Sequence, residues 1–204
     1  MNEITRLPKA QHETTQAADG LPRLKWTLEE FERLSELGFF GGADRERERL
    51  ELVAGELLPM HAKGRRHERV RGELFYCLSE MLPTGFRIFG EPGWRPRGDL
   101  YLEPEMLICK SGVHPDEAPP SDVLLLIEVA DSSLVYDTGL KANIYASLGV
   151  REYWVVNAKT LETTVHLAPN EQRYEQVATV APSETLTPHL LPALAVSLGA
   201  LKIG

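Results

Sequence analysis

The segment 123–130, with the sequence Val-Leu-Leu-Leu-Ile-Glu-Val-Ala, limits the possible folds of this chain more than any other feature. All of its residues but one are apolar, which is typical of a central strand that is buried on both faces of a sheet. Such a strand needs helices packed on both sides, so the segment favours an α/β architecture. The exception, Glu128, is the first candidate for a functional residue.

The rest of the chain alternates between helical and strand patterns. A capping-box sequence at Thr27 begins one helix, and a long helix covers residues 70–81 and ends before Pro83. Asp137 can cap a third helix that runs to about Leu148. We therefore predict an α/β (α+β) fold in which a mixed sheet is flanked by helices. Further strands are expected at residues 50–58 (with a bulge or hairpin at Gly55), 86–89, 101–109, 152–157, 163–167 and 174–180.

The length of 204 residues suits one domain, which we place at residues 23–204. Residues 1–22 are polar and aperiodic, so we expect a disordered lead-in that lacks the apolar core of a secretory signal. No apolar stretch is long enough for a transmembrane helix. Cys77 and Cys109 lie in apolar patterns and are interpreted as buried free thiols in a reducing compartment, so we expect a cytoplasmic protein.

Lys141 strengthens the case for a site at Glu128. In the expected helix it precedes Ile144, Tyr145 and Leu148 by three, four and seven residues, so it shares the apolar stripe that faces the sheet. One interpretation is that the lysine extends its amine to solvent and that Glu128 reaches water from a strand end. The other is that the ammonium and the carboxylate face each other, because each lowers the cost of burying its partner.

Glu105 supplies a second carboxylate. It opens an apolar strand segment, so its side chain can project beside Glu128 if the two strands pair; alone, Glu105 would be interpreted as a surface residue. Adjacent carboxylates repel each other unless a divalent cation joins them, and oxygen ligands suit Mg²⁺ or Mn²⁺. Lys141 could orient or deprotonate a nucleophile, or stabilise charge on a phosphate. Together the three residues favour metal-dependent hydrolysis.

These residues lie in recognisable motifs. Residues 127–134 read Ile-Glu-Val-Ala-Asp-Ser-Ser-Leu, residues 152–156 read Glu-Tyr-Trp-Val-Val, and Lys141 lies between them. With the stretches at 26–31, 51–57 and 191–194, they closely resemble the Uma-two family of restriction endonucleases, in the PD-(D/E)XK nuclease superfamily. The resemblance implies a restriction-endonuclease-like fold and an active site of Glu105, Glu128 and Lys141. The family usually has Asp where this chain has Glu105.

A further acidic ligand is expected from the segment 50–58. Glu56 has the strand parity of Leu52, which places it on the inward face, and it is our candidate for an additional metal ligand. The alternative interpretation of Glu56 is a surface residue beside a turn. Glu51 has the opposite parity and competes for the same role.

A basic run precedes and begins the long helix. Arg65, Arg66 and Arg69 are candidates for binding phosphate, because backbone N–H groups are also free at a helix N-terminus. The alternative interpretation is that these arginines lie on a solvent-exposed face of the helix, where neighbouring acidic residues balance their charge. His67, within the same run, is expected to be a surface histidine.

The net charge of −8 argues against a general nucleic-acid coat, but local basic patches can still hold a substrate. We expect an endonuclease that acts on DNA with Mg²⁺ (or Mn²⁺), with RNA left open as a substrate. A homodimer is expected if both strands of a duplex are cut, because that takes two sites. The alternatives are a catalytically inactive nuclease-fold binding module and a hydrolase that acts on another phosphodiester.

Overall fold

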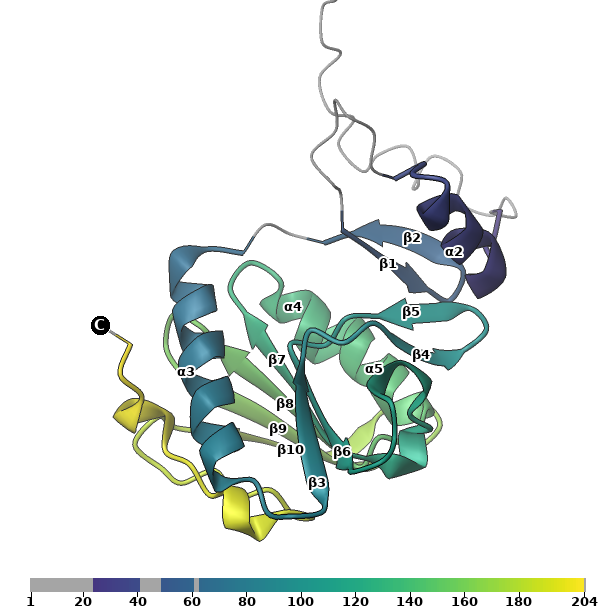
Figure 1. The fold of residues 1–204 in the computed structure, drawn as a ribbon. Coiled ribbons are helices and arrows are strands. Elements are labelled where there is room, and N and C mark those ends of the chain that lie inside the picture. Colours follow the sequence, from purple (N-terminus) through teal and green to yellow (C-terminus); the bar gives the residue numbers. More distant parts are fainter. Residues whose placement is uncertain (1–23, 41–48, 61–62, 204) are drawn as a thin grey trace, which may run out of the picture.

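The structure, a computed structural model, describes residues 24–40, 49–60 and 63–203 (Figure 1). The expected lead-in at 1–22 lies outside the described residues. The centre of the molecule is a six-stranded sheet in the order β10-β9-β8-β7-β6-β3. Strands β7 and β8 pair in parallel and the other neighbours pair antiparallel, so the sheet is mixed, as predicted. The bounds are β3 Phe86–Gly90, β6 Met106–Lys110, β7 Val123–Ala130, β8 Glu152–Asn157, β9 Thr163–Pro169 and β10 Tyr174–Val180.

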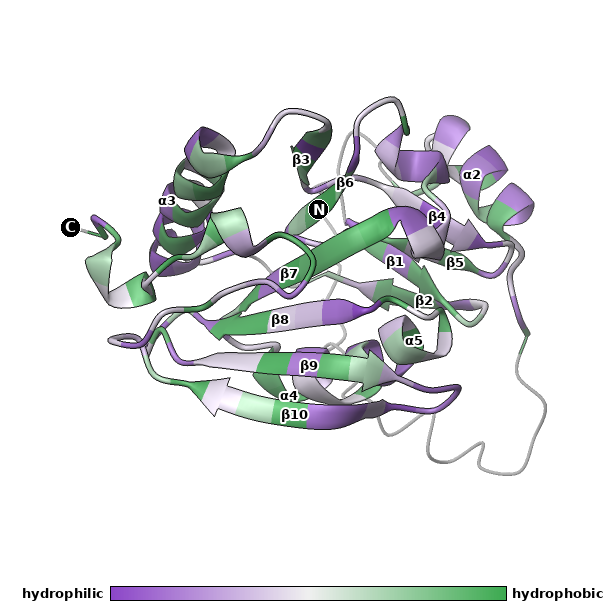
Figure 2. Ribbon diagram, turned by 90° about the horizontal axis from the view of Figure 1, so that it is seen from below, coloured by the Kyte–Doolittle hydropathy of each residue, from purple (hydrophilic) through white to green (hydrophobic). Residues whose placement is uncertain are grey.

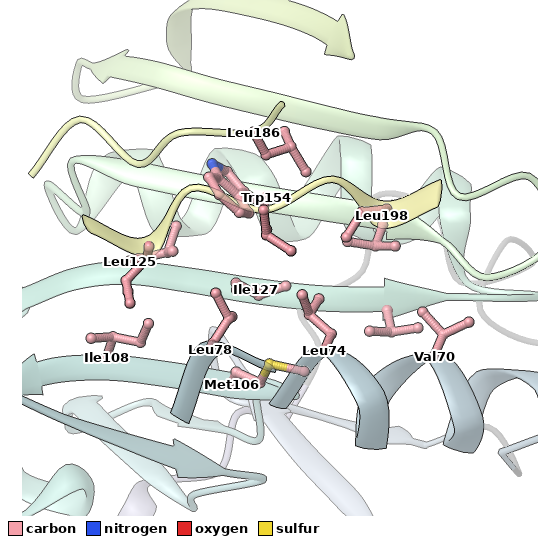
Figure 3. Close-up of a cluster of buried hydrophobic side chains, with 14 of the residues drawn as sticks. Val70, Leu74, Leu78, Met106, Ile108, Leu125, Ile127, Trp154, Leu186 and Leu198 are labelled. Carbon is pink, nitrogen blue, oxygen red and sulfur yellow. The ribbon is translucent and has the colours of Figure 1, made fainter. Parts of the chain in front are cut away.

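Strand β7 is buried along its whole length between two layers, which confirms the expectation from its apolar sequence (Figure 2). On one face, helix α3 (Arg65–Met81) inserts Val70, Leu74 and Leu78 against Ile127 and its neighbours (Figure 3). On the other face lies the helical segment made of α4 (Leu134–Tyr136), a π-helical turn (Asp137–Lys141) and α5 (Ala142–Ser147). The sheet therefore has helices on both faces, as its composition requires.

A second, four-stranded sheet in the order β2-β1-β5-β4 lies beside the larger one (Figure 1). Helix α2 (Leu28–Glu36) begins with the predicted capping box at Thr27, and its Phe31 packs against Tyr101 of this sheet. The strand bounds are β1 Leu50–Val53, β2 Glu56–Pro59, β4 Trp94–Arg97 and β5 Leu100–Leu102.

Of the two alternatives for residues 50–58, the hairpin is confirmed, because Ala54 and Gly55 both have positive φ angles, of 50° and 82°, and reverse the chain. Two other local expectations differ from the structure. The expected strand 101–109 is two strands in different sheets, interrupted around Pro104. The third helix begins at Leu134 with Ser133 as its N-cap residue, so Asp137 lies inside the helical segment and does not cap it.

Cys77 is half-buried and Cys109 is buried, and both are free thiols. None of the helices in the described ranges combines the length and the apolar character that a membrane crossing requires.

Candidate active site

The candidate active site is a cavity of about 540 Å³ between the two sheets and the N-terminal end of α3. Its lining includes the three residues singled out from sequence and several polar neighbours. The acidic and lysine side chains of the lining are Glu51, Lys63, Glu103, Glu105, Glu128, Asp131, Asp137 and Lys141.

At the base of the cavity, the Lys141 ammonium lies between two carboxylates. Its Nζ atom is 2.8 Å from Oε1 of Glu128 and 2.8 Å from Oε1 of Glu51. The exposed fractions of Lys141 and Glu128 are only 3% and 4%. The predicted contact between Lys141 and Glu128 is therefore confirmed, and the alternative in which the amine escapes to solvent is wrong.

The π-helical turn and the hairpin bring these groups together. Lys141 ends the turn Asp137–Lys141, which follows β7 after a short loop and folds back across the end of that strand. Glu51 comes from β1, which pairs with β5 of the smaller sheet through Leu52 and Tyr101. The site thus joins residues from both sheets.

Hydrogen bonds fix the two carboxylates that contact Lys141. The Tyr145 hydroxyl, one turn further along the helix, donates to Oε1 of Glu128 at 3.1 Å. The Glu103 backbone N–H donates to Oε1 of Glu51 at 3.0 Å, and the Tyr136 hydroxyl donates to its Oε2 at 3.4 Å. Such outer contacts hold charged groups in one orientation without contacting a substrate.

Glu105 lies beside Glu128, as expected from strand pairing. It immediately precedes β6, whose Met106 pairs with Ile127 of β7, and its backbone N–H donates to Oε2 of Glu128 at 3.2 Å. The Glu105 side chain is buried, although it had been assigned to the surface when considered alone. Its carboxylate contacts basic groups of the α3 region, as described below.

The electrostatics of the cavity are dominated by buried acids. Burial raises the pKa of Glu128 to about 8; Lys141 opposes this shift, while Asp137, Glu105 and Glu51 add to it. Burial also raises the pKa of the Asp137 carboxyl. Although burial disfavours the charged lysine, Glu128 and Glu51 raise the pKa of Lys141 well above its ordinary value. Lys141 is therefore a cation in a site that still contains excess negative charge.

The donor atoms suit a hard divalent cation. Within the described ranges, no three His, Cys, Asp or Glu side chains converge into a ready metal cage. Mg²⁺, however, is usually held by one or two carboxylates together with water and phosphate oxygens. Glu105 and Glu128 both line the cavity, and their carboxylates are close enough to interact electrostatically, so they provide such a pair. The residues present therefore fit Mg²⁺ or Mn²⁺ better than a softer metal.

The candidate ligand Glu56 lies elsewhere. It pairs with Val53 across the turn, which puts it on the same face of the hairpin as Glu51 but at the turn end. Its carboxylate binds the ammonium of Lys25 at 3.1 Å, and Glu56 does not line the cavity. The parity argument for Glu56 was wrong because a two-residue turn shifts the parity between its strands, and Glu51 takes the position in the site.

The candidate phosphate-binding arginines also lie outside the cavity lining. Arg65 and Arg69 are exposed on the first turns of α3. Arg66 donates hydrogen bonds to the backbone carbonyls of Ala158 at 2.7 Å and Lys159 at 3.1 Å, so its role is to attach the helix to the turn after β8. These arginines remain candidates only for contacts with parts of a substrate that extend beyond the cavity.

The α3 region instead contributes Lys63, His67 and Arg71, which are spaced four residues apart. Their nitrogen atoms lie 2.9, 3.2 and 3.6 Å from the Glu105 carboxylate. His67 is buried, so its assignment to the surface was wrong. The sequence did carry a signal, because His67 precedes Val70 by three residues and so begins the apolar stripe of α3.

The fold and the arrangement of acidic residues and lysine define a restriction-endonuclease-like protein. Residues 28–199 match the Uma2 (Uma-two) family, described as "Putative restriction endonuclease", and the chain belongs to this family. A crystal structure from Anabaena variabilis, described as "a putative nuclease belonging to DUF820", has a similar fold, with a TM-score of 0.62 at 15% sequence identity. The similarity covers 85% of this chain and 95% of that one. No match was found among curated proteins.

Proposed function

We propose that this protein is a metal-dependent endonuclease that hydrolyses phosphodiester bonds in DNA. The observation that carries the proposal is the position of the Lys141 ammonium, 2.8 Å from the Glu128 carboxylate at the base of an open cavity. A buried lysine and its acidic partners can contribute to a structure without any catalytic role. Here they line a cavity together with the carboxylate of Glu105, in a chain of a nuclease family.

Glu105 and Glu128 would hold the divalent cation. A bound Mg²⁺ supplies two effects, since it lowers the pKa of a coordinated water and stabilises negative charge on a phosphate. Burial, and after it the neighbouring carboxylates, raise the pKa of Glu128, and a divalent cation bound there would favour the charged form of its carboxyl group.

Lys141 would act as a cation and not as a base. Its carboxylate partners raise its pKa well above the ordinary value, so loss of its proton near neutral pH is unfavourable. An ammonium carries three N–H donors, and the contacts with Glu51 and Glu128 account for two of them. The third can donate to the attacking water or to a phosphate oxygen, where it would stabilise the charge that develops as water adds and the leaving oxygen departs.

Glu51 would position Lys141. It contacts the same ammonium as Glu128, and backbone and tyrosine donors hold its carboxylate. Asp137 is also buried in the cavity lining, where Ser133 donates to its Oδ2 at 2.6 Å, and it adds to the negative potential around Lys141.

A nucleic-acid substrate would have to be held by local positive charge. With a net charge of −8, the protein as a whole does not attract nucleic acid, so local cations near the cavity must hold the phosphates. A cleavage assay on single- and double-stranded DNA and RNA, with Mg²⁺, Mn²⁺ or a chelator, tests the function. We expect DNA cleavage that requires the divalent ion. Binding without cleavage under all conditions would overturn the proposal in favour of an inactive nuclease-fold module.

A further inference from the structure

The cavity contains a second ammonium group, and it differs from Lys141 in its accessibility. The Lys63 side chain is 16% exposed, against 4% for Lys141. Its Nζ atom lies 2.9 Å from Oε1 and 3.1 Å from Oε2 of Glu105. Glu105 is one of the two carboxylates of the proposed metal site, and both of its oxygens therefore face the Lys63 ammonium. A divalent cation that binds Glu105 must compete with Lys63 for the same lone pairs.

Lys63 also has a second partner, Glu91, which accepts a hydrogen bond from the same ammonium. Glu91 is held close by, because its backbone N–H donates to the Glu105 carbonyl at 3.1 Å. Its backbone has a φ of 49°, in the left-handed region that residues other than glycine adopt at some cost. The backbone is therefore strained at Glu91, the residue that binds Lys63 together with Glu105.

Glu91 is suited to retain a lysine that leaves Glu105. It is more exposed than Glu105, and it also contacts Arg49 at 2.8 Å and Arg71 at 3.4 Å. Three basic side chains therefore surround the Glu91 carboxylate. Because its contact with Lys63 does not involve the proposed metal ligands, Lys63 keeps an ionic partner when it gives up Glu105.

We propose that Lys63 is an exchangeable cation of the active site, which occupies Glu105 in the metal-free protein, yields it to the divalent ion while remaining on Glu91, and then contacts the substrate phosphate. This inference rests on the proposed metal-dependent function. The reason for the exchange is charge. A divalent ion at Glu105 repels the ammonium, whereas the phosphodiester that follows brings a negative charge that attracts it.

The exchange predicts opposite effects on two measurements for Lys63→Met, which keeps the aliphatic stem and removes the charge. Mn²⁺ should bind more tightly by about fivefold or more, because its competitor is gone, whereas the KM for DNA should rise by a similar factor. Mn²⁺ affinity is measured by titration calorimetry without DNA, and circular dichroism verifies folding. Lys110→Met is the matched control, because Lys110 is exposed at the other end of β6 from Glu105. It should change neither quantity.

A second pair of variants tests the role of Glu91. Glu91→Gln should weaken Mn²⁺ binding. The Lys63 ammonium then loses one of its charged partners, pairs more strongly with Glu105 and competes better with the divalent cation. If Glu91 acts through Lys63, the same substitution should have no effect on Mn²⁺ affinity in a Lys63→Met background. An equal loss in both backgrounds would mean that Glu91 binds the metal itself, and would overturn the exchange.

The failure of this inference and the failure of the proposed function are distinguishable. If Glu105→Ala abolishes Mn²⁺ binding while Lys63→Met leaves it unchanged or weaker, the metal site stands and the exchange is wrong. If the wild-type protein binds no Mn²⁺, both the metal site and the exchange are wrong.

Discussion

The Lys141 ammonium lies 2.8 Å from Oε1 of Glu128, and both side chains are almost completely buried at the base of a cavity. Each group is unfavourable in its position without the other, because burial raises the pKa of Glu128 to about 8 and opposes the charge on Lys141. Their contact makes the lysine a permanent cation next to the proposed metal ligands.

Replacement of Lys141 by Met should preserve the fold and reduce cleavage by ~10² or more, the scale of a lost charge stabiliser. The methionine retains the packing of the lysine stem, and Glu128, with its raised pKa, can accept a proton when its partner is absent. The measurements are the single-turnover cleavage rate and circular dichroism. A folded variant that cleaves at the wild-type rate would show that Lys141 is structural.

The hairpin β1–β2 offers a matched pair of variants. Glu51→Gln should lower the cleavage rate by about 10-fold or more, because the amide holds Lys141 less firmly. Glu56→Gln should not lower it, since this residue lies on the same face of the hairpin but binds Lys25 outside the cavity. The cleavage rates of the two variants, measured side by side, decide between these glutamates. Equal losses, or a loss only for Glu56→Gln, would contradict the assignment.

The resemblance to Uma-two proteins implies aspartate at the position where this chain has Glu105. Glu105→Asp should retain or raise activity, because the charge is kept and the family's side chain is restored. Glu105→Ala should abolish activity, since one of the two proposed metal ligands is lost. The rates of both variants are compared at saturating Mg²⁺. Wild-type cleavage by the alanine variant would make Glu105 a bystander.

Glu152 gives a prediction for the pH dependence of stability. Burial raises its pKa above the usual 4.5, although the His189 backbone N–H and the Trp154 Nε1–H donate to it. The folded state therefore holds this proton more tightly than the unfolded state. As pH rises from 4.5 toward the raised pKa, the group lowers the free energy of unfolding by up to ~1.4 kcal/mol per pH unit.

Glu152→Gln should remove this contribution, so its free energy of unfolding should fall less steeply with pH than that of the wild type. The variant should also be less stable by about 1–3 kcal/mol, because its amide NH₂ faces an N–H donor. Urea unfolding at several pH values measures both effects. Parallel pH profiles of the two proteins would show that Glu152 does not titrate in this way.

The sequence was sufficient to find Glu128 and Lys141, because each is a charged residue within an apolar pattern that must face the core. The all-apolar strand and the helical stripe both have to face the core, so a charged group in either must meet a partner. The same reasoning, applied to the stripe of α3, would have found His67.

The position of Glu51 could not be predicted in this way. It depends on the turn at Ala54 and Gly55, which shifts the strand parity, and on the pairing of β1 with β5, about 50 residues further along the chain. The division of the expected strand 101–109 between two sheets has a similar origin, because only the folded chain shows which neighbour each half finds.

If Glu105, Glu128 and Lys141 form the active site of a nuclease, the charge of Glu128 is required for cleavage. The measurement is single-turnover cleavage of end-labelled DNA by wild type and Glu128→Gln in Mg²⁺. Glutamine keeps the size of the side chain but removes the charge that contacts both Lys141 and the proposed metal. We predict cleavage by the wild type that stops on addition of a chelator, and a rate for Glu128→Gln that is lower by ~10² or more. Equal rates for the two proteins, or cleavage that persists in chelator, would show that Glu128 and a divalent cation are not needed for catalysis.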